Sequence, residues 1–249
     1  MNIAIIFAGG VGKRLAQENN SVPKQFLKIN NKPIIIHTLE LFQNHSEIDK
    51  IYIAINPDYY DYMQELVKYF YITKTAGIVK GGATGQNSIY NALKMAQSEN
   101  SEDSIVLIHD GVRPNITPEV ISENIACAKK NGNAITCTSC QETILVSTTG
   151  INPEHVPYRK DTYSAQAPQT FRLGDIVAAH EKINKINPDY TDIVDSCTLF
   201  KTLGIPTFMV KVNRGNIKIT TIEDLYILRA LIRYKEDIEA FDLKGVLIK

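Results

Sequence analysis

The chain has 249 residues, of which 27 are Lys or Arg and 27 are Asp or Glu, so its formal net charge is zero. This balance argues against nucleic acid or an anionic membrane surface as a partner, because both attract proteins with a positive field. No stretch approaches the roughly 20 apolar residues that span a bilayer, and the short opening run lacks the form of a secretory leader, so we expect a cytoplasmic protein.

The chain opens with an apolar run, residues 2–8, that ends abruptly in the glycine-rich loop 9–14. Buried parallel strands end in this way, and open α/β sheets place ligands at that end. Glycines let backbone N–H groups approach an anion, and Lys13, Arg14 and Lys24 add full positive charges. We therefore expect a polyphosphate site; the alternative is a glycine-rich turn with solvated cations.

Two familiar phosphate-binding motifs do not fit this loop. A Walker A motif requires a glycine where Phe7 stands and a hydroxyl where Arg14 stands. A dinucleotide fingerprint requires a third glycine where Leu15 stands, and no acidic residue ends a second strand at the expected distance. A polyphosphate must therefore be bound by a different arrangement.

Strands and helices are expected to alternate through the next part of the chain. Residues 33–42 carry apolar side chains at helical spacing, with Pro33 in the first turn, although three consecutive isoleucines also suit a strand. Residues 51–55 are expected to form a strand, followed by a helix that opens at Asn56.

A third strand, residues 77–79, leads into a second glycine-rich loop, where Asn87 or Ser88 is expected to cap the next helix. The remaining elements of this part are a strand over 104–108, a helix from Pro118 with Thr117 as its cap, and a strand over 134–138. This alternation predicts a doubly wound, Rossmann-like α/β fold with a mostly parallel sheet.

The alternation stops at residues 141–163, where two short arms around Thr149 and Gly150 predict an inserted β-hairpin. Because an isolated hairpin is marginally stable in water, we expect this arm to pack on a partner subunit. The remaining expected elements are helices over 173–183, 192–203 and 222–238 and a strand over 207–212. No linker interrupts the chain, so residues 1–249 are expected to form one domain.

Asp110 and Arg113 follow the fourth strand almost directly. A carboxylate at a strand end suits Mg²⁺, which takes one or two carboxylates and completes its shell with phosphates and water. The alternative is a structural ion pair. His109 is expected to pack or hydrogen-bond, because no second His or Cys stands at metal spacing. The C-x-x-C pair at residues 137 and 140 is interpreted as reduced core cysteines.

Near the end of the chain, Thr221 is expected to cap the closing helix, with Asp224 where a capping box carries its acidic residue. Lys218 stands between two isoleucines in a strand-like stretch, so its side chain points away from both. It is expected to face either solvent or the cleft, and local sequence does not choose between them.

Seven segments together resemble the cytidylyltransferases that make CDP-alcohols from CTP and a sugar or polyol phosphate. The segments are Ala8 to Arg14, Pro23 to Phe26, Gly81-Gly82 leading to Ser88-Ile89, His109 to Pro114, Ala167 to Phe171, Thr191-Asp192, and Asn216 to Thr220. They occur in family order over nearly the whole chain. The two best-known branches use methylerythritol 4-phosphate, in isoprenoid synthesis, and ribitol 5-phosphate, in teichoic acid or capsule synthesis.

The resemblance implies a role for each matching position. The CTP site would be lined by Ala8, Gly9, Gly10, Gly12, Gly82 and Ser88. The catalytic cations would be Arg14, Lys24 and Lys218, and Asp110 would hold Mg²⁺. The acceptor would contact Arg159, Thr191, Asp192 and Lys218, with Arg159 serving either its own subunit or the neighbour. Family members are commonly homodimers that exchange the hairpin arm.

The implied reaction is attack of the acceptor's phosphate on the α-phosphorus of CTP, with pyrophosphate leaving. A phosphate monoester is already largely dianionic at neutral pH, so no strong general base is required. The rate enhancement would then come from alignment and from stabilisation of the developing charge.

Three positions depart from the family pattern. Gly85 stands where many relatives have Arg, Ala167 where Thr is usual, and Gly215 where the isoprenoid branch commonly has an acidic residue. Val112 and the run 115–117 favour the ribitol phosphate branch over the isoprenoid branch. The departures concern the acceptor and a second metal carboxylate rather than the type of reaction.

A function of another class would be a nucleotide-binding regulator that uses this fold without catalysis. The presence of Lys24, Asp110 and Lys218 argues against it. A nucleic-acid binder is a weaker alternative, given the neutral charge balance.

Overall fold

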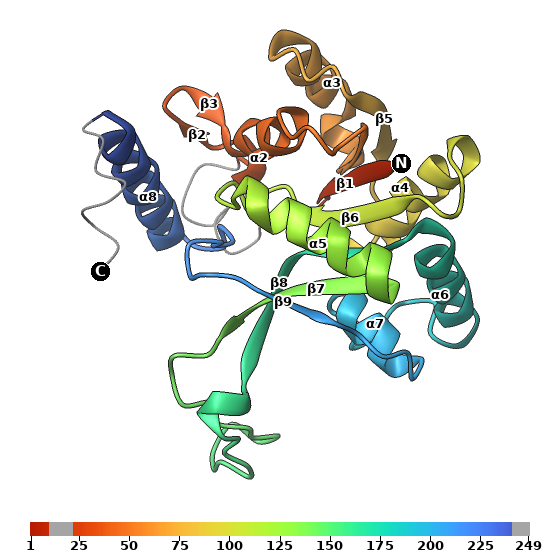
Figure 1. Cartoon of the computed structure of the whole chain (residues 1–249), viewed down its shortest axis with the longest axis vertical. Coiled ribbons are helices and arrows are strands. Elements are labelled where there is room, and N and C mark those ends of the chain that lie inside the picture. Colours follow the sequence, from red (N-terminus) through yellow and green to blue (C-terminus); the bar gives the residue numbers. More distant parts are fainter. Residues whose placement is uncertain (10–21, 241–249) are drawn as a thin grey trace.

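The computed structural model describes residues 1–9 and 22–240 (Figure 1). Its main sheet has seven strands in the order β5-β4-β1-β6-β8-β7-β9. The strands are β1 (Asn2–Ala8), β4 (Lys50–Ile55), β5 (Thr75–Lys80), β6 (Ile105–Asp110), β7 (Asn133–Ser139), β8 (Tyr163–Arg172) and β9 (Met209–Lys211). The helices are α2 (Ile34–Gln43), α3 (Tyr60–Tyr69), α4 (Gly85–Glu99), α5 (Pro118–Asn131), α6 (Leu173–Ile186), α7 (Ser196–Thr202) and α8 (Ile222–Ala240).

The chain winds outward in one direction and then returns to the other side of β1. β1 pairs in parallel with both β4 and β6, and β4 pairs in parallel with β5. The order of strands therefore reverses between β1 and β6, which is where doubly wound sheets bind ligands at the carboxyl ends of their strands. The predicted doubly wound, mostly parallel α/β fold is confirmed.

β1 is apolar from Ile3 to Ala8, as expected for a strand whose two faces are both covered by helices. Successive side chains of a strand point to opposite faces. Ile3 and Ile5 pack in one cluster with apolar side chains of α4, α6 and α7, whereas Ala4 and Ile6 pack in a second cluster with α2, α3 and α5. This two-sided burial holds the end of β1 in a fixed position beside the end of β6.

β8 is the strand of the main sheet that the sequence did not predict. It runs antiparallel to both of its neighbours, β6 and β7, and so completes a mixed sheet. Its pairing with β7 shifts between Gln169, opposite Ile135, and Ala165, opposite Cys137. Pro168 lies inside this irregular stretch. A proline cannot donate to a ladder and is tolerated at such interruptions, which is why the sequence did not read as a central strand.

Several predicted boundaries move by a few residues. The cap of α4 is Thr84, whose hydroxyl accepts from the Asn87 backbone N–H, so the predicted caps Asn87 and Ser88 were wrong. Asn87 is instead the reciprocal half of a capping box. The helix expected over 192–203 is α7, which begins at Ser196 after its cap Asp195.

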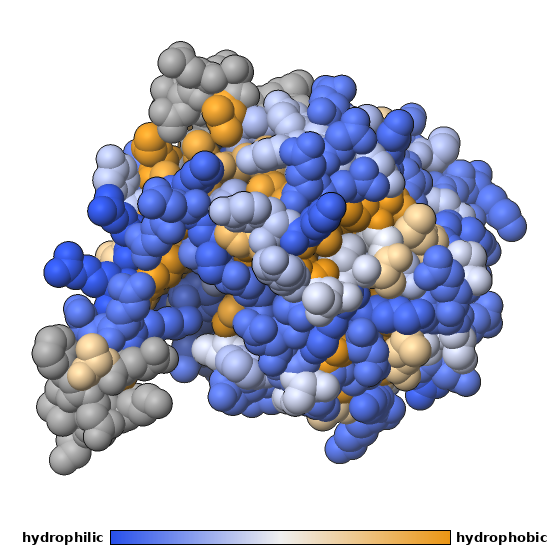
Figure 2. All heavy atoms as spheres, turned by 90° about the horizontal axis from the view of Figure 1, so that it is seen from above, coloured by the Kyte–Doolittle hydropathy of each residue, from blue (hydrophilic) through white to orange (hydrophobic). Residues whose placement is uncertain are grey.

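The predicted hairpin arm, residues 141–163, has a single antiparallel bridge, between Val146 and His155. A short 3-10 helix, η3 (Arg159–Asp161), leads from it into β8. The arm extends away from the sheet (Figure 1) and exposes large apolar side chains, with Ile151 82% and Tyr158 78% exposed. The face of the molecule in Figure 2 is mostly hydrophilic, with apolar residues showing in scattered places.

Within the described part of the chain, no helix combines the length and the apolar character that crossing a bilayer requires.

Candidate active site

Two glycine-containing segments meet at the carboxyl end of β1. A Cβ atom placed on Gly9 would lie 2.8 Å from Ser88 Oγ, and one placed on Gly81 would lie 2.9 Å from the same atom. Side chains at either position would therefore push the segments apart. Ser88 Oγ also accepts a hydrogen bond from the Gly82 N–H at 3.0 Å and donates to the Thr84 carbonyl at 2.9 Å. Ser88 thus holds the second glycine-rich loop in place.

Lys24 is positioned by its neighbour Gln25. The two residues begin the short 3-10 helix η1 (Lys24–Phe26), and the buried Gln25 side chain donates from Nε2 to the Ala8 carbonyl at 3.0 Å. This bond ties η1 to the end of β1, so the Lys24 side chain starts close to the sheet edge where β1 ends.

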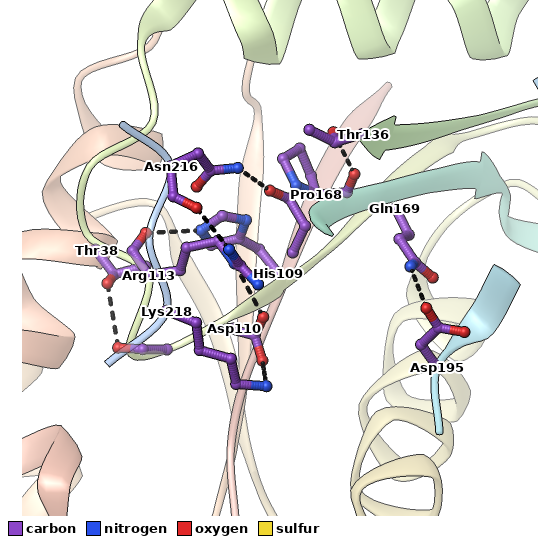
Figure 3. A network of polar contacts seen from close by, with 12 residues as sticks. Thr38, His109, Asp110, Arg113, Thr136, Pro168, Gln169, Asp195, Asn216 and Lys218 are labelled. Atoms are coloured by element: carbon purple, nitrogen blue, oxygen red, sulfur yellow. Dashed lines mark hydrogen bonds and ion pairs between the residues drawn. The ribbon is translucent and has the colours of Figure 1, made fainter. Parts of the chain in front are cut away.

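Asp110 is the last residue of β6 rather than lying past its end, and its backbone pairs with Phe7 in β1. Two cations contact its carboxylate, as Figure 3 shows: Lys218 Nζ lies 2.6 Å from Oδ1, and Arg113 Nε lies 3.2 Å from Oδ2. Burial alone would raise the pKa of this carboxyl, but the charges of Lys218 and Arg113 outweigh burial and lower it. Asp110 is therefore ionised at neutral pH.

Lys218 faces the cleft, which decides between its two expected orientations. Arg113 Nη1 donates to the Asn216 carbonyl at 2.6 Å, and Asn216 Nδ2 donates to the Ala167 carbonyl at 2.7 Å. These bonds tie the segment that carries Lys218 to the end of β6 on one side and to β8 on the other (Figure 3). Local sequence could not reveal this, because both contacts join residues far apart in the chain.

His109 is fully buried beside this ion-pair cluster and bonds through Nε2 to the Arg113 carbonyl at 3.0 Å. Burial lowers the pKa of His109 to about 4, so the ring is neutral at physiological pH. Its contacts agree with the expected packing and hydrogen-bonding role.

Two adjoining cavities open at this edge of the sheet. The first, of about 380 Å³, we call the glycine cavity; its lining includes Ala8, Gly9, Lys24, Gly82, Asp110 and Lys218. The second, of about 230 Å³, we call the β8 cavity; its lining includes Gln86, Asp110, Gln166, Asp195, Ser196 and Lys218. Asp110 and Lys218 belong to both, so a molecule in either cavity would meet the same pair of opposite charges.

The expected site residues fall into three groups. The glycine cavity brings Lys24, Asp110 and Lys218 together with Ala8, Gly9 and Gly82, and Ser88 is bonded to the Gly82 N–H. Gly10, Gly12 and Arg14 lie outside the described residues.

The remaining expected residues do not line either cavity. Arg159 is exposed at the base of the arm, where its Nη1 donates to the Gln141 carbonyl at 3.4 Å. Thr191 and Asp192 are exposed, and the β8 cavity is instead lined from that stretch by Val194, Asp195 and Ser196. The acceptor-binding roles of Arg159, Thr191 and Asp192 stay predictions.

Sequence reasoning missed the polar residues of the β8 cavity. Gln166 and Gln169 come from β8, which was not predicted, and Asp195 was placed inside a helix that in fact begins after it. The Ala-Pro-Gln segment was the one signal that pointed to this region.

The residues present fit a magnesium ion that is shared with a phosphate ligand. Among residues 1–9 and 22–240, no group of three or more His, Cys, Asp or Glu side chains could hold a metal by itself. A single buried carboxylate, Asp110, lies in the glycine cavity, and Mg²⁺ is usually bound through one or two carboxylates plus substrate phosphates. Lys218 Nζ contacts Asp110 Oδ1, so a metal ion bound to this oxygen would share it with the lysine or displace the lysine from it.

The model of the 2-C-methyl-D-erythritol 4-phosphate cytidylyltransferase (IspD) family matches residues 2–234 of the chain. The chain belongs to this family. It is therefore a cytidylyltransferase.

Named relatives come from both branches of the family. This cytidylyltransferase is 40% identical to a ribitol-5-phosphate cytidylyltransferase of Streptococcus agalactiae serotype III, over 98% of this chain and 100% of the relative. It is 38% identical to a 2-C-methyl-D-erythritol 4-phosphate cytidylyltransferase of Clostridium botulinum, over 90% and 94%. The crystal structure of 4-diphosphocytidyl-2C-methyl-D-erythritol synthase from Anaerococcus prevotii superposes with a TM-score of 0.78 at 26% identity, covering 94% and 96% of the two chains.

Proposed function

We propose that this cytidylyltransferase transfers CMP from CTP to D-ribitol 5-phosphate with Mg²⁺, giving CDP-ribitol and pyrophosphate. The observation that carries the proposal is the convergence of Lys24, Asp110 and Lys218 on one cavity, beside a second cavity large enough for a small alcohol. The whole-length similarity to ribitol-5-phosphate cytidylyltransferases supports this acceptor.

The glycine cavity would hold CTP. Its glycines let the nucleotide approach the backbone, and Lys24 would bind the triphosphate and stabilise the charge that develops there when the α-phosphorus is attacked. When bound, Mg²⁺ would neutralise phosphate charge, with Asp110 as its protein ligand.

Lys218 would bind the acceptor's phosphate. In the structure Lys218 Nζ contacts Asp110 Oδ1 at 2.6 Å, at the boundary between the two cavities. An acceptor phosphate there would replace the carboxylate as the partner of Lys218. The lysine would thereby hold the attacking oxygen next to the nucleotide, and alignment of this kind is a major contribution to phosphoryl-transfer rates.

The alternative acceptor is 2-C-methyl-D-erythritol 4-phosphate. The family model and the Clostridium botulinum relative favour it, at an identity only slightly below that of the ribitol phosphate relatives. Both reactions use the same nucleotide chemistry and differ in the alcohol part of the acceptor.

The exposed apolar side chains of the arm support a homodimer in which the arm packs on the neighbouring subunit. Leu145, Ile151 and Tyr158 are each more than half exposed. Burying such groups against a second copy would be favourable, because apolar area removed from water contributes about 25 cal/mol per Å². Size-exclusion chromatography with light scattering tests this: deletion of the arm should give a monomer.

Pyrophosphate release tests the proposed reaction. The purified protein is incubated with CTP and Mg²⁺ and, separately, with D-ribitol 5-phosphate, 2-C-methyl-D-erythritol 4-phosphate or glycerol phosphate. Release with D-ribitol 5-phosphate and mass-spectrometric detection of CDP-ribitol are expected. Release with only methylerythritol phosphate would assign the other acceptor, and CTP binding without turnover for every acceptor would favour a regulator.

A further inference from the structure

The β8 cavity contains polar side-chain atoms that have no hydrogen-bond partner. Gln86 is 4% exposed and Ser196 is 1% exposed, and both line the cavity together with the half-buried Gln166. Gln86 Oε1, Gln166 Oε1 and Ser196 Oγ are all buried without a partner. Most buried polar atoms in folded proteins are paired, so three orphan oxygens around one small cavity indicate a ligand with hydrogen-bonding groups.

The irregular pairing of β8 brings this polar lining together. In a regular strand, adjacent residues face opposite sides of the sheet. Here Ala165, Gln166 and Ala167 all line the same cavity, at the place where the register with β7 shifts. The Asn216 side chain, bonded to the Ala167 carbonyl, anchors this stretch to the segment that carries Lys218.

The far wall of the cavity is held rigid by Asp195 and Gln169. Gln169 Nε2 donates to Asp195 Oδ2 at 2.8 Å, and Gln169 Oε1 accepts from the Cys197 N–H at 2.9 Å. Asp195 Oδ1 accepts from the Thr198 N–H at 2.7 Å as the cap of α7. These bonds fix the start of α7, so Ser196 Oγ is presented at a defined position.

The chemistry of the lining matches a polyhydroxylated chain. A glutamine Oε1 accepts a hydrogen bond, and a serine hydroxyl both donates and accepts, which are the capacities that the hydroxyl groups of an alditol satisfy. Ile89, Ile108 and Val194 provide apolar surface between these polar groups for the carbon chain. Lys218 at the boundary with the glycine cavity provides the place for the phosphate end.

We propose that Gln86, Gln166 and Ser196 bind the hydroxyl groups of the acceptor's alditol chain and thereby select acceptors by chain length and hydroxylation. This inference rests on the proposed cytidylyltransfer to a polyol phosphate and assigns specificity to residues on α4, β8 and α7. The lining rejects a shorter or deoxygenated chain because such a chain leaves buried oxygens unpaired.

The test compares two acceptors that differ by one hydroxyl-bearing carbon, D-ribitol 5-phosphate and erythritol 4-phosphate, at saturating CTP. Gln166→Leu and Gln86→Leu are each expected to raise the KM for ribitol phosphate about 10-fold, because each loses about one hydrogen bond to a buried group. Each variant should also bring the kcat/KM for ribitol phosphate closer to the kcat/KM for erythritol phosphate. The KM for CTP should not change. Ser196→Ala should shift the ratio in the same direction.

Gln64→Leu is the matched control, because Gln64 lies on α3, is exposed, and lines neither cavity. Gln166→Asn and Gln86→Asn keep an amide but shorten it, and they replace any leucine variant that fails to fold. An unchanged acceptor ratio in folded Gln86 and Gln166 variants would overturn the assignment.

If the wild-type protein uses methylerythritol phosphate instead, the proposed acceptor is wrong, and the same variants are compared with that acceptor and its deoxy analogue. If no acceptor turns over, calorimetric titration of ribitol 5-phosphate into the CTP-bound protein gives the same comparison through binding. Equal affinity of wild type and variants would then refute the assignment.

Discussion

Lys218 and Arg113 contact the same carboxylate, and replacing each of them with Met would separate catalysis from stability. The two ion pairs differ in burial rather than in partner. The Lys218 side chain is 39% exposed, whereas that of Arg113 is 9% exposed, and Asp110 itself is 8% exposed. Arg113 also donates to the Asn216 carbonyl, which Lys218 does not.

The expected magnitudes follow from this difference. For Lys218→Met, solvent screening limits the loss in the free energy of unfolding to about 1 kcal/mol, although its distance to Asp110 is the shorter of the two. For Arg113→Met, a buried charge loses its buried partner, and the expected loss is about 3–5 kcal/mol. Turnover of Lys218→Met should fall by about 10²–10³-fold, because the acceptor's phosphate would lose its cation.

Urea denaturation followed by circular dichroism measures the unfolding free energies, and pyrophosphate release measures turnover. Lys218→Arg is the control, since it keeps the positive charge while changing its geometry. Equal destabilisation by the two Met variants would show that burial does not govern these pairs. Near-full turnover in Lys218→Met would remove Lys218 from the mechanism.

Three further outcomes are expected. Lys24→Ala should fold normally and lose about 10²–10³-fold in turnover, measured by pyrophosphate release, because it removes a cation from the triphosphate site. Burial lowers the pKa of His180 to about 3, so only the unfolded chain takes up this proton as the pH falls below about 6.5. Between about pH 7.5 and about pH 5.5, His180 should therefore lower the free energy of unfolding by about 1.4 kcal/mol, in addition to the loss that the buried His109 contributes. Urea titrations of the wild type should show the part that His180 contributes, and those of His180→Gln should lack it. Asp224→Ala should lower the free energy of unfolding, measured by thermal or urea denaturation, by about 1 kcal/mol, since Asp224 Oδ2 accepts from the Thr220 and Thr221 backbone N–H groups at the start of α8. An unchanged stability would show that these two bonds contribute nothing.

The local pattern of apolar residues was enough to predict the parallel strands of the sheet. The runs that became β1, β4 and β6 are apolar without alternation, and each gives way to polar or glycine residues where the strand ends. Strands covered by helices on both faces must have such a composition, and the carboxyl ends of parallel strands lie on one edge. Lys24 and Asp110 could therefore be placed at one site from the sequence.

Local pattern failed where a residue's role depends on distant partners. Lys218 faces the cleft because Arg113 and Asn216 fasten its segment to β6 and β8. Neither of these two contacts can be predicted from the residues next to Lys218 in the sequence.

The sequence by itself therefore determined the fold class, the edge of the sheet at which Lys24 and Asp110 lie and, through the family motifs, the type of reaction. The tertiary structure alone decided what lines the β8 cavity. β8 is antiparallel and irregular around Pro168, and it faces the start of α7 across a cavity. A strand that is buried on both faces can be recognised from its own apolar composition. A cavity between elements depends on how those elements pack, and no single segment of the sequence determines that packing.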